Sequence, residues 1–421
     1  MNDRRPNILL VTVDSLRADH CGFMGYGKET TPTLDGVAAN SVVFENAIAP
    51  GPSTPASMPA VFTAQYPVAR NEHESLLERR RDQIQTHMET RETIPETLKR
   101  RGYTTAAFTP NPFTSRYFGF DQGFDRFEDF MDGSRRGQRY ESVFRGFLRG
   151  DSSRSLARVL LNLYQREEVF KPWNAYYDEI RAWLDHTGEP YFLWVFLMDA
   201  HNPYLAPATY RTQAKWKEFH ANYRFWRGSH ETPFSDSVHE RLVTAYDDAI
   251  RYVDEFVAKL FTRLDDRTVL LVHGDHGEAF HEHGTYGHGP SLWEENIHVP
   301  LLIHGLSGQT RIETPVSLRR LPEVARRIAD GQPITETTSP AVFSQTFDGK
   351  KRLLRGRSWR YLDDGEDRTL EHLATDESRS VSSREPDTDV LVGYLAGVVE
   401  AQRERERIVE GTEHLWSTDR V

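Results

Sequence analysis

Residues 7–15 read NILLVTVDS, a continuous run of apolar and β-branched side chains that stops at an acidic residue. Such a run is typical of a β-strand buried on both faces, as in a parallel sheet covered by helices. Asp14 would then lie at the carboxyl end of this strand, where open α/β sheets place their chemistry. The stretch therefore predicts both a fold class and the position of a site.

Runs of the same kind recur along the chain, at residues 41–44, 104–108, 191–197, 268–272 and 299–303. Helical patterns lie between them, at residues 33–39, 93–101, 155–166, 175–184 and 238–264. Strands that alternate with helices predict an α/β protein with a mostly parallel, doubly wound central sheet.

The alternation ends near residue 335. Residues 340–347 and 351–362 are expected to pair as antiparallel strands, residues 375–388 form a polar loop, and residues 389–409 have helical periodicity. We therefore expect a catalytic domain over residues 1–335 and a small C-terminal α+β subdomain with a tail over residues 336–421.

Two segments inside the catalytic domain interrupt the alternation. Residues 133–171 and 206–235 contain many Arg, Trp and Tyr residues and carry no strand signal. We expect them to be insertions over the sheet that shape a substrate pocket.

Composition limits the kinds of partner. The chain has 421 residues and a formal net charge of −11, whereas nucleic acids and acidic membranes favour a basic footprint.

Cys21 is the single cysteine, so no intrachain disulfide can form. No apolar stretch reaches membrane-spanning length and the first residues do not resemble a signal peptide, so the expected location is the cytoplasm. An anionic small substrate would need a local positive centre such as a metal.

Histidines concentrate in residues 271–300, LVHGDHGEAFHEHGTYGHGPSLWEENIHVP, which hold six of the chain's 17 histidines. Asp275 and His276 follow the predicted strand 268–272 there. Asp199 and His201 likewise follow strand 191–197, and Asp14 follows the first strand. Because carboxyl ends of parallel strands share one edge of a sheet, these groups predict a site for a metal and an anion.

Five motifs in order carry a family resemblance: PNILLVTVDS, TPASMPAVFTAQYP, FLMDAHNPY, HGDHGEAFHEHG and GHGPSLWEENIHVPLLI. Together they resemble the sulfatase branch of the alkaline phosphatase superfamily, over about Pro6 to Ile303. The resemblance implies an alkaline phosphatase-like fold and cleavage of phosphoric or sulfuric esters.

The resemblance also implies one divalent cation per chain, held by Asp14, Asp275 and His276, with the oxygen of the Thr54 nucleophile as a further ligand. Two carboxylates and an imidazole suit Zn²⁺ or Mn²⁺ and can admit Ca²⁺ or Mg²⁺, so the identity of the metal stays open. The cation would lower the pKa of the bound hydroxyl and neutralise charge on the transferred group.

The identity of the nucleophile is harder to assign from the sequence. Sulfatases use a formylglycine made from Cys or Ser in a Cys/Ser-x-Pro-x-Arg motif, and Cys21 lies far from that position. Alignment on the local proline selects Ser53 but leaves Ser57 where the arginine should stand. Counting back from the family's Thr-x-x-Tyr-Pro ending, here residues 63–67, selects Thr54 instead.

The spacing of Thr54, Ser57, Pro59 and Phe62 also resembles phosphoethanolamine transferases, which attack phosphorus with a threonine. We therefore predict Thr54 as the nucleophile. A helix is expected to begin just after it, at Pro55 or Ala56, so that the helix amino end favours a negative group beside the hydroxyl. The same position could instead make Thr54 a helix N-cap, and the two roles are compatible.

Two histidines are expected around the transferred group. By the resemblance, His201 contacts its oxygens and protonates the leaving group, and His288 stands where many sulfatases have a lysine. Four other histidines are expected to be structural, namely His273, His281, His298 and His304. The role of His283 stays open. Two departures make the pocket less like that of a sulfatase, namely Ser15 in place of a second Asp and Met58 in place of an Arg.

These observations favour a metal-dependent hydrolase or transferase that cleaves a phosphate ester or diester through a covalent Thr54 intermediate. The expected substrate is a small anionic ester, for example on a glycan or a lipid headgroup. The alternative is a sulfuric ester hydrolase of the arylsulfatase type. A further alternative is a non-catalytic binding protein that keeps the fold, because a fold alone does not prove a function.

Overall fold

The computed structural model describes residues 5–67, 76–130, 171–306, 308–373 and 377–380, and in the C-terminal tail residues 389–398, 400, 401, 404 and 408. The predicted helix 155–166 and nearly all of the predicted insertion 133–171 lie outside these residues.

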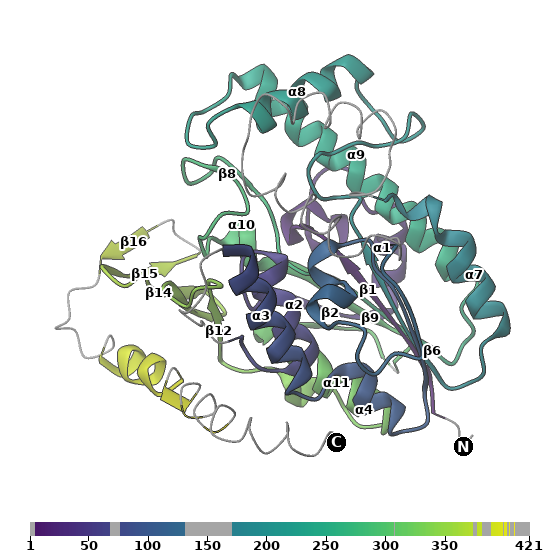
Figure 1. Cartoon of the computed structure of the whole chain (residues 1–421). Coiled ribbons are helices and arrows are strands. Elements are labelled where there is room, and N and C mark those ends of the chain that lie inside the picture. The colour runs from purple at the N-terminus through teal and green to yellow at the C-terminus, as the bar shows by residue number, and fades with distance from the viewer. Residues whose placement is uncertain are drawn as a thin grey trace.

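A nine-stranded sheet forms the centre of the described chain, in the order β10-β2-β9-β6-β1-β5-β3-β4, with β11 also beside β2 (Figure 1). Only β9 runs antiparallel to its neighbours, so the prediction of a mostly parallel sheet is confirmed. The strands are β1 (Asn7–Val13), β2 (Ser41–Ile48), β3 (Thr104–Phe108), β4 (Arg126–Glu128), β5 (Tyr191–Leu197), β6 (Thr268–Gly274), β9 (His298–His304), β10 (Thr310–Ile312) and β11 (Val316–Ser317).

Helices cover both faces of this sheet, because successive side chains of a strand point to opposite faces. On β1, Ile8 and Leu10 belong to one apolar core, and Leu9 and Val11 belong to the other. The first core includes α2 (Thr54–Thr63), α3 (Leu76–Glu89), α4 (Ile94–Lys99) and α11 (Leu321–Ala329). The second includes α1 (Pro32–Ala38), α7 (Tyr177–His186), α8 (Lys215–Arg227) and α9 (Asp236–Phe261).

Short elements complete the catalytic part. β7 (Ala279–Phe280) pairs with β8 (Tyr286–Gly287), and α10 (Glu294–Ile297) leads into β9. The 3-10 helices are η1 (Ala18–His20), η2 (Gly22–Met24), η3 (Pro112–Thr114), η4 (Arg116–Phe118), η5 (Trp173–Ala175), η6 (Leu318–Arg320) and η7 (Thr335–Thr337). Among the described helices, none has the length and apolarity needed to cross a bilayer.

A small antiparallel sheet follows, at the left of Figure 1. Its strands are β12 (Ala341–Gln345), β13 (Arg352–Gly356), β14 (Trp359–Asp363), β15 (Arg368–His372) and β16 (Glu377–Ser380). The chain therefore has an alkaline phosphatase-like α/β fold with a small C-terminal sheet, as predicted. Two details were wrong: residues 351–362 form two strands joined by a turn, and the predicted polar loop 375–388 contains β16.

Candidate active site

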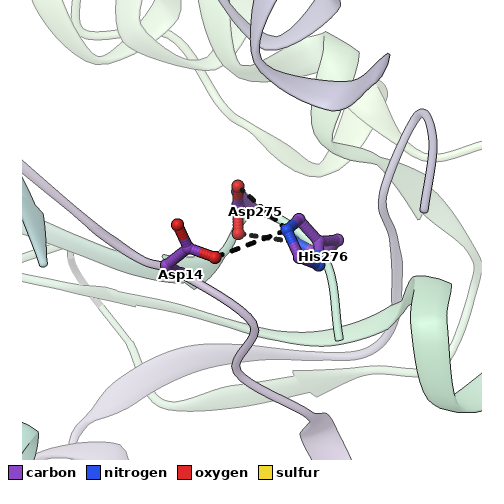
Figure 2. Close-up of side chains that lie close together, drawn as sticks. All are labelled: Asp14, Asp275 and His276. Atoms are coloured by element: carbon purple, nitrogen blue, oxygen red, sulfur yellow. Dashed lines mark hydrogen bonds and ion pairs between the residues drawn. The ribbon is translucent and has the colours of Figure 1, made fainter. Parts of the chain in front are cut away.

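Three buried side chains meet where β1 and β6 end side by side. Asp14 follows β1, and Asp275 and His276 follow β6, whose last residues pair in parallel register with those of β1. The Asp275 backbone N–H donates to the Val13 carbonyl oxygen over 3.2 Å, which holds the two loops together. One ligand atom from each of the three side chains lies within 4.8 Å of the other two (Figure 2). This group could hold a metal ion.

Glycines on either side of Asp275 and His276 allow the backbone to pass close to its neighbours. A Cβ atom on Gly274 would lie 2.4 Å from the Leu16 carbonyl oxygen. A Cβ atom on Gly277 would lie 2.0 Å from the Glu295 carbonyl oxygen. The two glycines are therefore required sterically at this crossing. The Asp-His pair between them supplies two candidate metal ligands.

Thr54 brings a hydroxyl to the same three residues. Its Oγ1 atom donates to Asp275 Oδ2 over 2.8 Å and lies 3.4 Å from His276 Nε2. The helix α2 begins at Thr54, before the predicted start at Pro55 or Ala56, and its N-cap is Ser53 rather than Thr54. Ser57, one turn later, donates to the Asp275 backbone carbonyl oxygen over 2.7 Å and fixes α2 against this loop.

Asn111 is a site residue that the sequence reasoning missed. It follows β3, and its Nδ2 atom donates to Asp14 Oδ2 over 2.7 Å and lies 3.5 Å from Thr54 Oγ1. Its side-chain oxygen accepts from the Phe113 N–H, which fixes the amide orientation. The available signal is its position, because Asn111 lies just beyond the carboxyl end of the predicted strand 104–108.

The residues at the two departures from the sulfatase pattern have other roles in this structure. Ser15 adopts a left-handed conformation with φ 59°, unusual for a residue other than glycine. Its Oγ donates to Asp14 Oδ1 over 3.0 Å, so it orients a carboxylate and supplies no charge of its own. Met58 is fully buried in the apolar core below the sheet. The site therefore lacks the arginine and the second aspartate of the sulfatase pattern.

The electrostatics of this cluster favour a bound cation. Burial, together with the nearby Asp14 carboxylate, raises the pKa of Asp275 to about 7. Burial opposes the charged form of His276, but Asp275 and Asp14 outweigh it and raise the pKa of that imidazole to about 9. Burial also opposes ionisation of Asp14, yet the histidines His201, His276 and His288 hold its pKa well below the usual range. Two buried carboxylates this close require compensating positive charge.

The donor set fits a divalent metal. His276 Nδ1 lies 2.8 Å from the Gly277 carbonyl oxygen, to which it donates, so Nε2 faces Asp14 and Asp275 at 3.4 and 3.6 Å. A backbone carbonyl that fixes the ring in this way is usual for a metal-binding histidine. Two carboxylates and one imidazole nitrogen are ligands that Zn²⁺ and Mn²⁺ accept.

His201 and His288 lie beside this group. The ring centroid of His288 is 4.6 Å from that of His276 and 5.2 Å from that of His201. His201 Nδ1 lies 2.5 Å from the Asn202 carbonyl oxygen, and burial lowers the pKa of His201 although the Asp14 carboxylate raises it. The structure therefore brings together all six predicted site residues, which are Asp14, Thr54, His201, Asp275, His276 and His288.

Glu278 is the second residue that the sequence reasoning missed. Its side chain is fully buried, and Oε1 lies 3.1 Å from His288 Nδ1. The Tyr204 hydroxyl donates to Oε2 over 2.9 Å. Burial opposes its negative charge, but the neighbouring His288 outweighs this and lowers the pKa of Glu278. A glutamate two residues after His276 was visible in the HGDHGE motif, but its partner was not.

The other predicted residues lie in structural contacts. Asp199 Oδ2 accepts from the Trp173 backbone N–H over 3.2 Å. His283, left open by the sequence, pairs with Glu295 Oε2 at 3.0 Å and stacks on Trp293. The remaining histidines bond to groups outside the cluster or lie in a turn: His273 with Thr12, His298 with Glu45, His304 with Ser41, and His281 at φ 77°.

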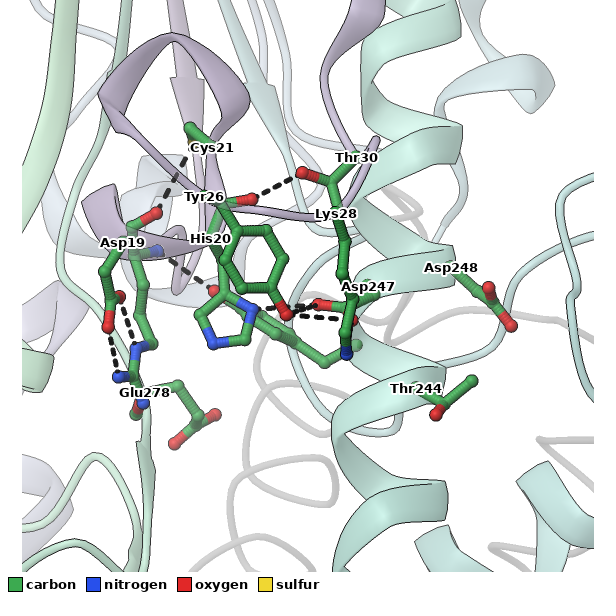
Figure 3. Close-up of polar contacts among 12 residues, drawn as sticks. Asp19, His20, Cys21, Tyr26, Lys28, Thr30, Thr244, Asp247, Asp248 and Glu278 are labelled. Carbon is green, nitrogen blue, oxygen red and sulfur yellow. Dashed lines mark hydrogen bonds and ion pairs between the residues drawn. The ribbon is translucent and has the colours of Figure 1, made fainter.

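A polar network beside the site anchors the loop that follows Asp14 (Figure 3). Asp247 of α9 accepts from Lys28 over 2.8 Å and pairs with His20 Nδ1 at 2.8 Å. Arg17 forms a bidentate pair with Asp19 and donates to the Glu278 carbonyl oxygen over 2.9 Å. The loop after β1 is thus fixed both to α9 and to the loop after β6.

Cys21 lies within this network and is fully buried. Burial raises the pKa of its thiol well above the usual value. A thiol held in its protonated form is a weak nucleophile, so Cys21 stays a poor candidate for the attacking group.

The fold and this constellation define a class, the alkaline phosphatase-like enzymes that cleave ester bonds. Within that class, the sulfatase family model matches residues 6–325, and the chain belongs to the sulfatase family. This family consists of ester-cleaving hydrolases. A curated relative is the uncharacterized sulfatase YidJ of Escherichia coli strain K12, 24% identical over 153 residues. That match spans 31% of this chain and 30% of the relative.

Solved structures share the fold at low identity. The phosphonate monoester hydrolase of Agrobacterium radiobacter superposes with a TM-score of 0.64 at 16% identity, over 95% of this chain and 96% of that one. A putative sulfatase of Bacteroides thetaiotaomicron gives 0.63 at 15% identity, over 97% and 94%. The C-terminal periplasmic domain of EptC of Escherichia coli, in complex with zinc, gives 0.56 at 17% identity, over 85% and 93%.

Proposed function

We propose that this enzyme is a metal-dependent phosphoesterase or phosphotransferase that cleaves a phosphate ester or diester through a covalent Thr54 intermediate. The observation that carries the proposal is the Thr54 hydroxyl, which donates to Asp275 Oδ2 over 2.8 Å at the centre of the acidic cluster. The metal would be held by Asp14, Asp275 and His276, with Zn²⁺, Mn²⁺, Ca²⁺ and Mg²⁺ as candidates and one ion per chain. When bound, it would supply positive charge that stabilises the oxygens of the transferred group.

The chain's own residues account for each bond change. Thr54 Oγ forms the new bond to phosphorus and its proton passes to the Asp275 carboxylate, which already accepts its hydrogen bond. The bond from phosphorus to the leaving oxygen breaks, and His201 or His288 gives that oxygen a proton. Water or an alcohol then attacks the phosphothreonine and gives its proton to the histidine that protonated the leaving oxygen. The bond from phosphorus to Thr54 Oγ1 breaks, and the proton held by Asp275 returns to that oxygen. Hydrolase and transferase differ only in whether water or an alcohol attacks.

Three observations support phosphorus over sulfur at this site. The hydroxyl that donates to Asp275 belongs to a threonine, Cys21 is buried in the other apolar core from that of α2, and buried Met58 stands where the sulfatase motif has an arginine. Two of the similar structures, a phosphonate monoester hydrolase and the phosphoethanolamine transferase EptC, are named for phosphorus chemistry. Below 25% identity they support the fold alone, so the substrate assignment is ours.

A sulfuric ester hydrolase is the second candidate, because the family match is to sulfatases and Ser53 directly precedes Thr54. In that case Ser53 would be converted to formylglycine, a loss of two hydrogens and about two mass units by the chemistry of the step. Intact mass of the purified chain therefore distinguishes the two nucleophiles.

The decisive experiment compares Thr54→Ala, Thr54→Ser and Ser53→Ala on phosphate monoester, phosphate diester, phosphonate and sulfate ester substrates, each with a panel of divalent metals. We expect Thr54→Ala to lose turnover, Thr54→Ser to keep part of it, and Ser53→Ala to resemble the wild type. Full activity in Thr54→Ala, or loss confined to Ser53→Ala, would contradict the Thr54 mechanism. Metal content and the melting temperature of each variant serve as controls for folding.

A further inference from the structure

Helix α8 carries an aromatic surface that its packing does not use. It contacts α9 and buries Glu218, Ala221, Asn222 and Phe225, and it lies at the top of Figure 1. On its outer side, Trp216 is 60% exposed, Phe219 41% and Trp226 37%. They are three of the six large apolar side chains exposed within the described part of the chain. The exposure of three such rings on one helix requires an explanation, because exposed apolar patches often mark binding surfaces.

The spacing of these residues gathers the rings into one stripe. Positions three and four apart lie on the same side of a helix, so Trp216, Phe219, Tyr223 and Trp226 form a continuous row. By the same geometry, Lys217, Arg224 and Arg227 form a row beside it on the solvent side. The outer face of α8 is thus divided lengthwise into an aromatic half and a basic half.

Acidic side chains are missing from this outer face. Glu218, the one acid of α8, is buried and pairs with Arg211 at 2.9 Å. Arg241 of α9 adds a further cation, with its guanidinium carbon 5.2 Å from the centroid of the Trp216 ring. In a chain with a net charge of −11, this local concentration of basic groups selects an anionic partner.

We propose that α8 docks the enzyme on the surface of a membrane that contains anionic lipids. Tryptophan and phenylalanine rings enter the boundary between headgroups and acyl chains, while lysine and arginine attract anionic headgroups. A helix with both rows along its outer side is suited to lie in the membrane plane rather than to cross the bilayer. Its 13 residues give a contact about 20 Å long.

The inner side of α8 connects this surface to the active site. Asn222 exchanges two hydrogen bonds with the Tyr204 backbone, and the Tyr204 hydroxyl donates to Glu278. Phe225 lies against Gly287, the residue before His288, where an added Cβ would be 3.7 Å from the ring. A docked enzyme would hold its site close to lipid headgroups. The role of docking in bringing the site to its substrate rests on the proposed function, whereas membrane binding itself does not.

The test is co-sedimentation of the full chain with vesicles of phosphatidylcholine alone or of equal parts phosphatidylcholine and phosphatidylserine. We expect binding to the mixed vesicles to exceed binding to the neutral ones, and to weaken as salt is added. The Trp216→Ser/Trp226→Ser double variant should bind about tenfold less, because it loses the buried apolar area. Arg224→Gln/Arg227→Gln should lose the preference for phosphatidylserine.

Two control variants separate docking from catalysis and from general exposure. Tyr394→Ser removes a ring that is 52% exposed on the C-terminal helix and should bind vesicles like the wild type. Thr54→Ala should also bind like the wild type, so failure of the chemistry and failure of docking are distinguishable. Phosphatidylcholine carrying a cleavable phosphodiester headgroup then reports whether vesicle-bound enzyme has a higher turnover than free enzyme.

Several results would overturn the proposal. Equal vesicle binding by the wild type and the tryptophan double variant would exclude α8 as the docking surface. Binding to soluble anionic polysaccharide but not to vesicles would assign the surface to a glycan. Dimers that dissociate in the double variant would assign it to a second copy of the chain. A lower melting temperature of the double variant would show that the rings are packed within the molecule.

Discussion

Glu278 is the buried carboxylate that positions His288, and it supplies the first prediction. Its Oε1 lies 3.1 Å from His288 Nδ1 and its Oε2 accepts from Tyr204. Glu278→Gln keeps the shape and the contact with Tyr204 but removes the carboxylate charge that faces His288 Nδ1. We expect turnover to fall about 10- to 100-fold, with metal content unchanged, as for other carboxylate partners of site histidines. Steady-state kinetics and metal analysis measure both.

A matched control exists in the same loop region. Glu295→Gln removes the carboxylate from His283, a similar pair at 3.0 Å that lies outside the metal cluster. We expect turnover close to that of the wild type. Equal losses in the two variants would mean that Glu278 acts on folding and not on His288.

His273 supplies a pH prediction. Its ring is fully buried and neutral, between Thr12 at Nε2 and the Gly274 carbonyl oxygen at Nδ1, and burial lowers its pKa from 6.5 to about 4. The unfolded chain therefore binds the proton first, so this contribution to stability is complete above pH 6.5 and is lost as the pH falls toward 4. The loss amounts to about 3 kcal/mol at the acid end.

Urea denaturation of the wild type and of His273→Gln across this pH range measures that contribution. The variant should be less stable at pH 6.5 but should lose less stability on acidification, because it lacks the titrating ring. Parallel pH profiles would exclude His273 as a source of acid sensitivity.

Residues at the site differed in how far the sequence revealed them. Asp14, Asp275 and His276 were predictable because each directly follows an apolar run, and the structure places them in contact. Their roles stay predictions. Asn111 and Glu278 were missed because their value lies in their partners, and a single sequence contains no distances between side chains.

At the scale of elements, buried strands were the most predictable feature. β1, β3 and β5 have the predicted bounds, since a strand covered on both faces is apolar throughout. The small C-terminal sheet was harder, because its strands are short and because β14 and β15 are only partly buried. The strand β13 ends at Gly356, whose missing Cβ leaves room for the Trp359 ring at the start of β14, but the sequence prediction merged the two strands.

The crossing of the loop after β6 with α10 gives the element-scale prediction. Gly277→Ala would place a methyl group 2.0 Å from the Glu295 carbonyl oxygen, and backbone cannot move aside as a flexible side chain can. We expect a loss of about 1–3 kcal/mol in the free energy of unfolding, together with weaker metal binding at neighbouring His276. Gly289→Ala is the matched control, since its Cβ would meet nothing within 4 Å. Similar stability of the two variants would contradict the steric account.

At the scale of the whole molecule, the small sheet supports the segment that leads into Thr54. The Gln345 N–H of β12 donates to the Pro50 carbonyl oxygen, and Ser344 Oγ donates to that of Ala49. Both acceptors lie in the segment that leads into Thr54. Ala60 and Tyr66 of α2 and its C-terminal extension also pack in one apolar cluster with the small sheet. The predicted boundary at residue 335 therefore separates two sheets that share one site.

A chain that ends at residue 335 tests this dependence. It would remove the two hydrogen bonds to residues 49–50 and the bond from the Tyr66 hydroxyl to the Phe343 carbonyl oxygen, and it would expose Ala60 and Tyr66 to water. We expect turnover to be lost and the melting temperature to fall, because the segment before Thr54 loses its support while the metal ligands stay in place. Calorimetry, activity assays and metal analysis measure the melting temperature, the turnover and the metal binding separately.

Full activity with an unchanged melting temperature would show that residues 1–335 form an independent catalytic domain. Loss of metal binding as well would mean that the small sheet supports the entire cluster and not only its nucleophile.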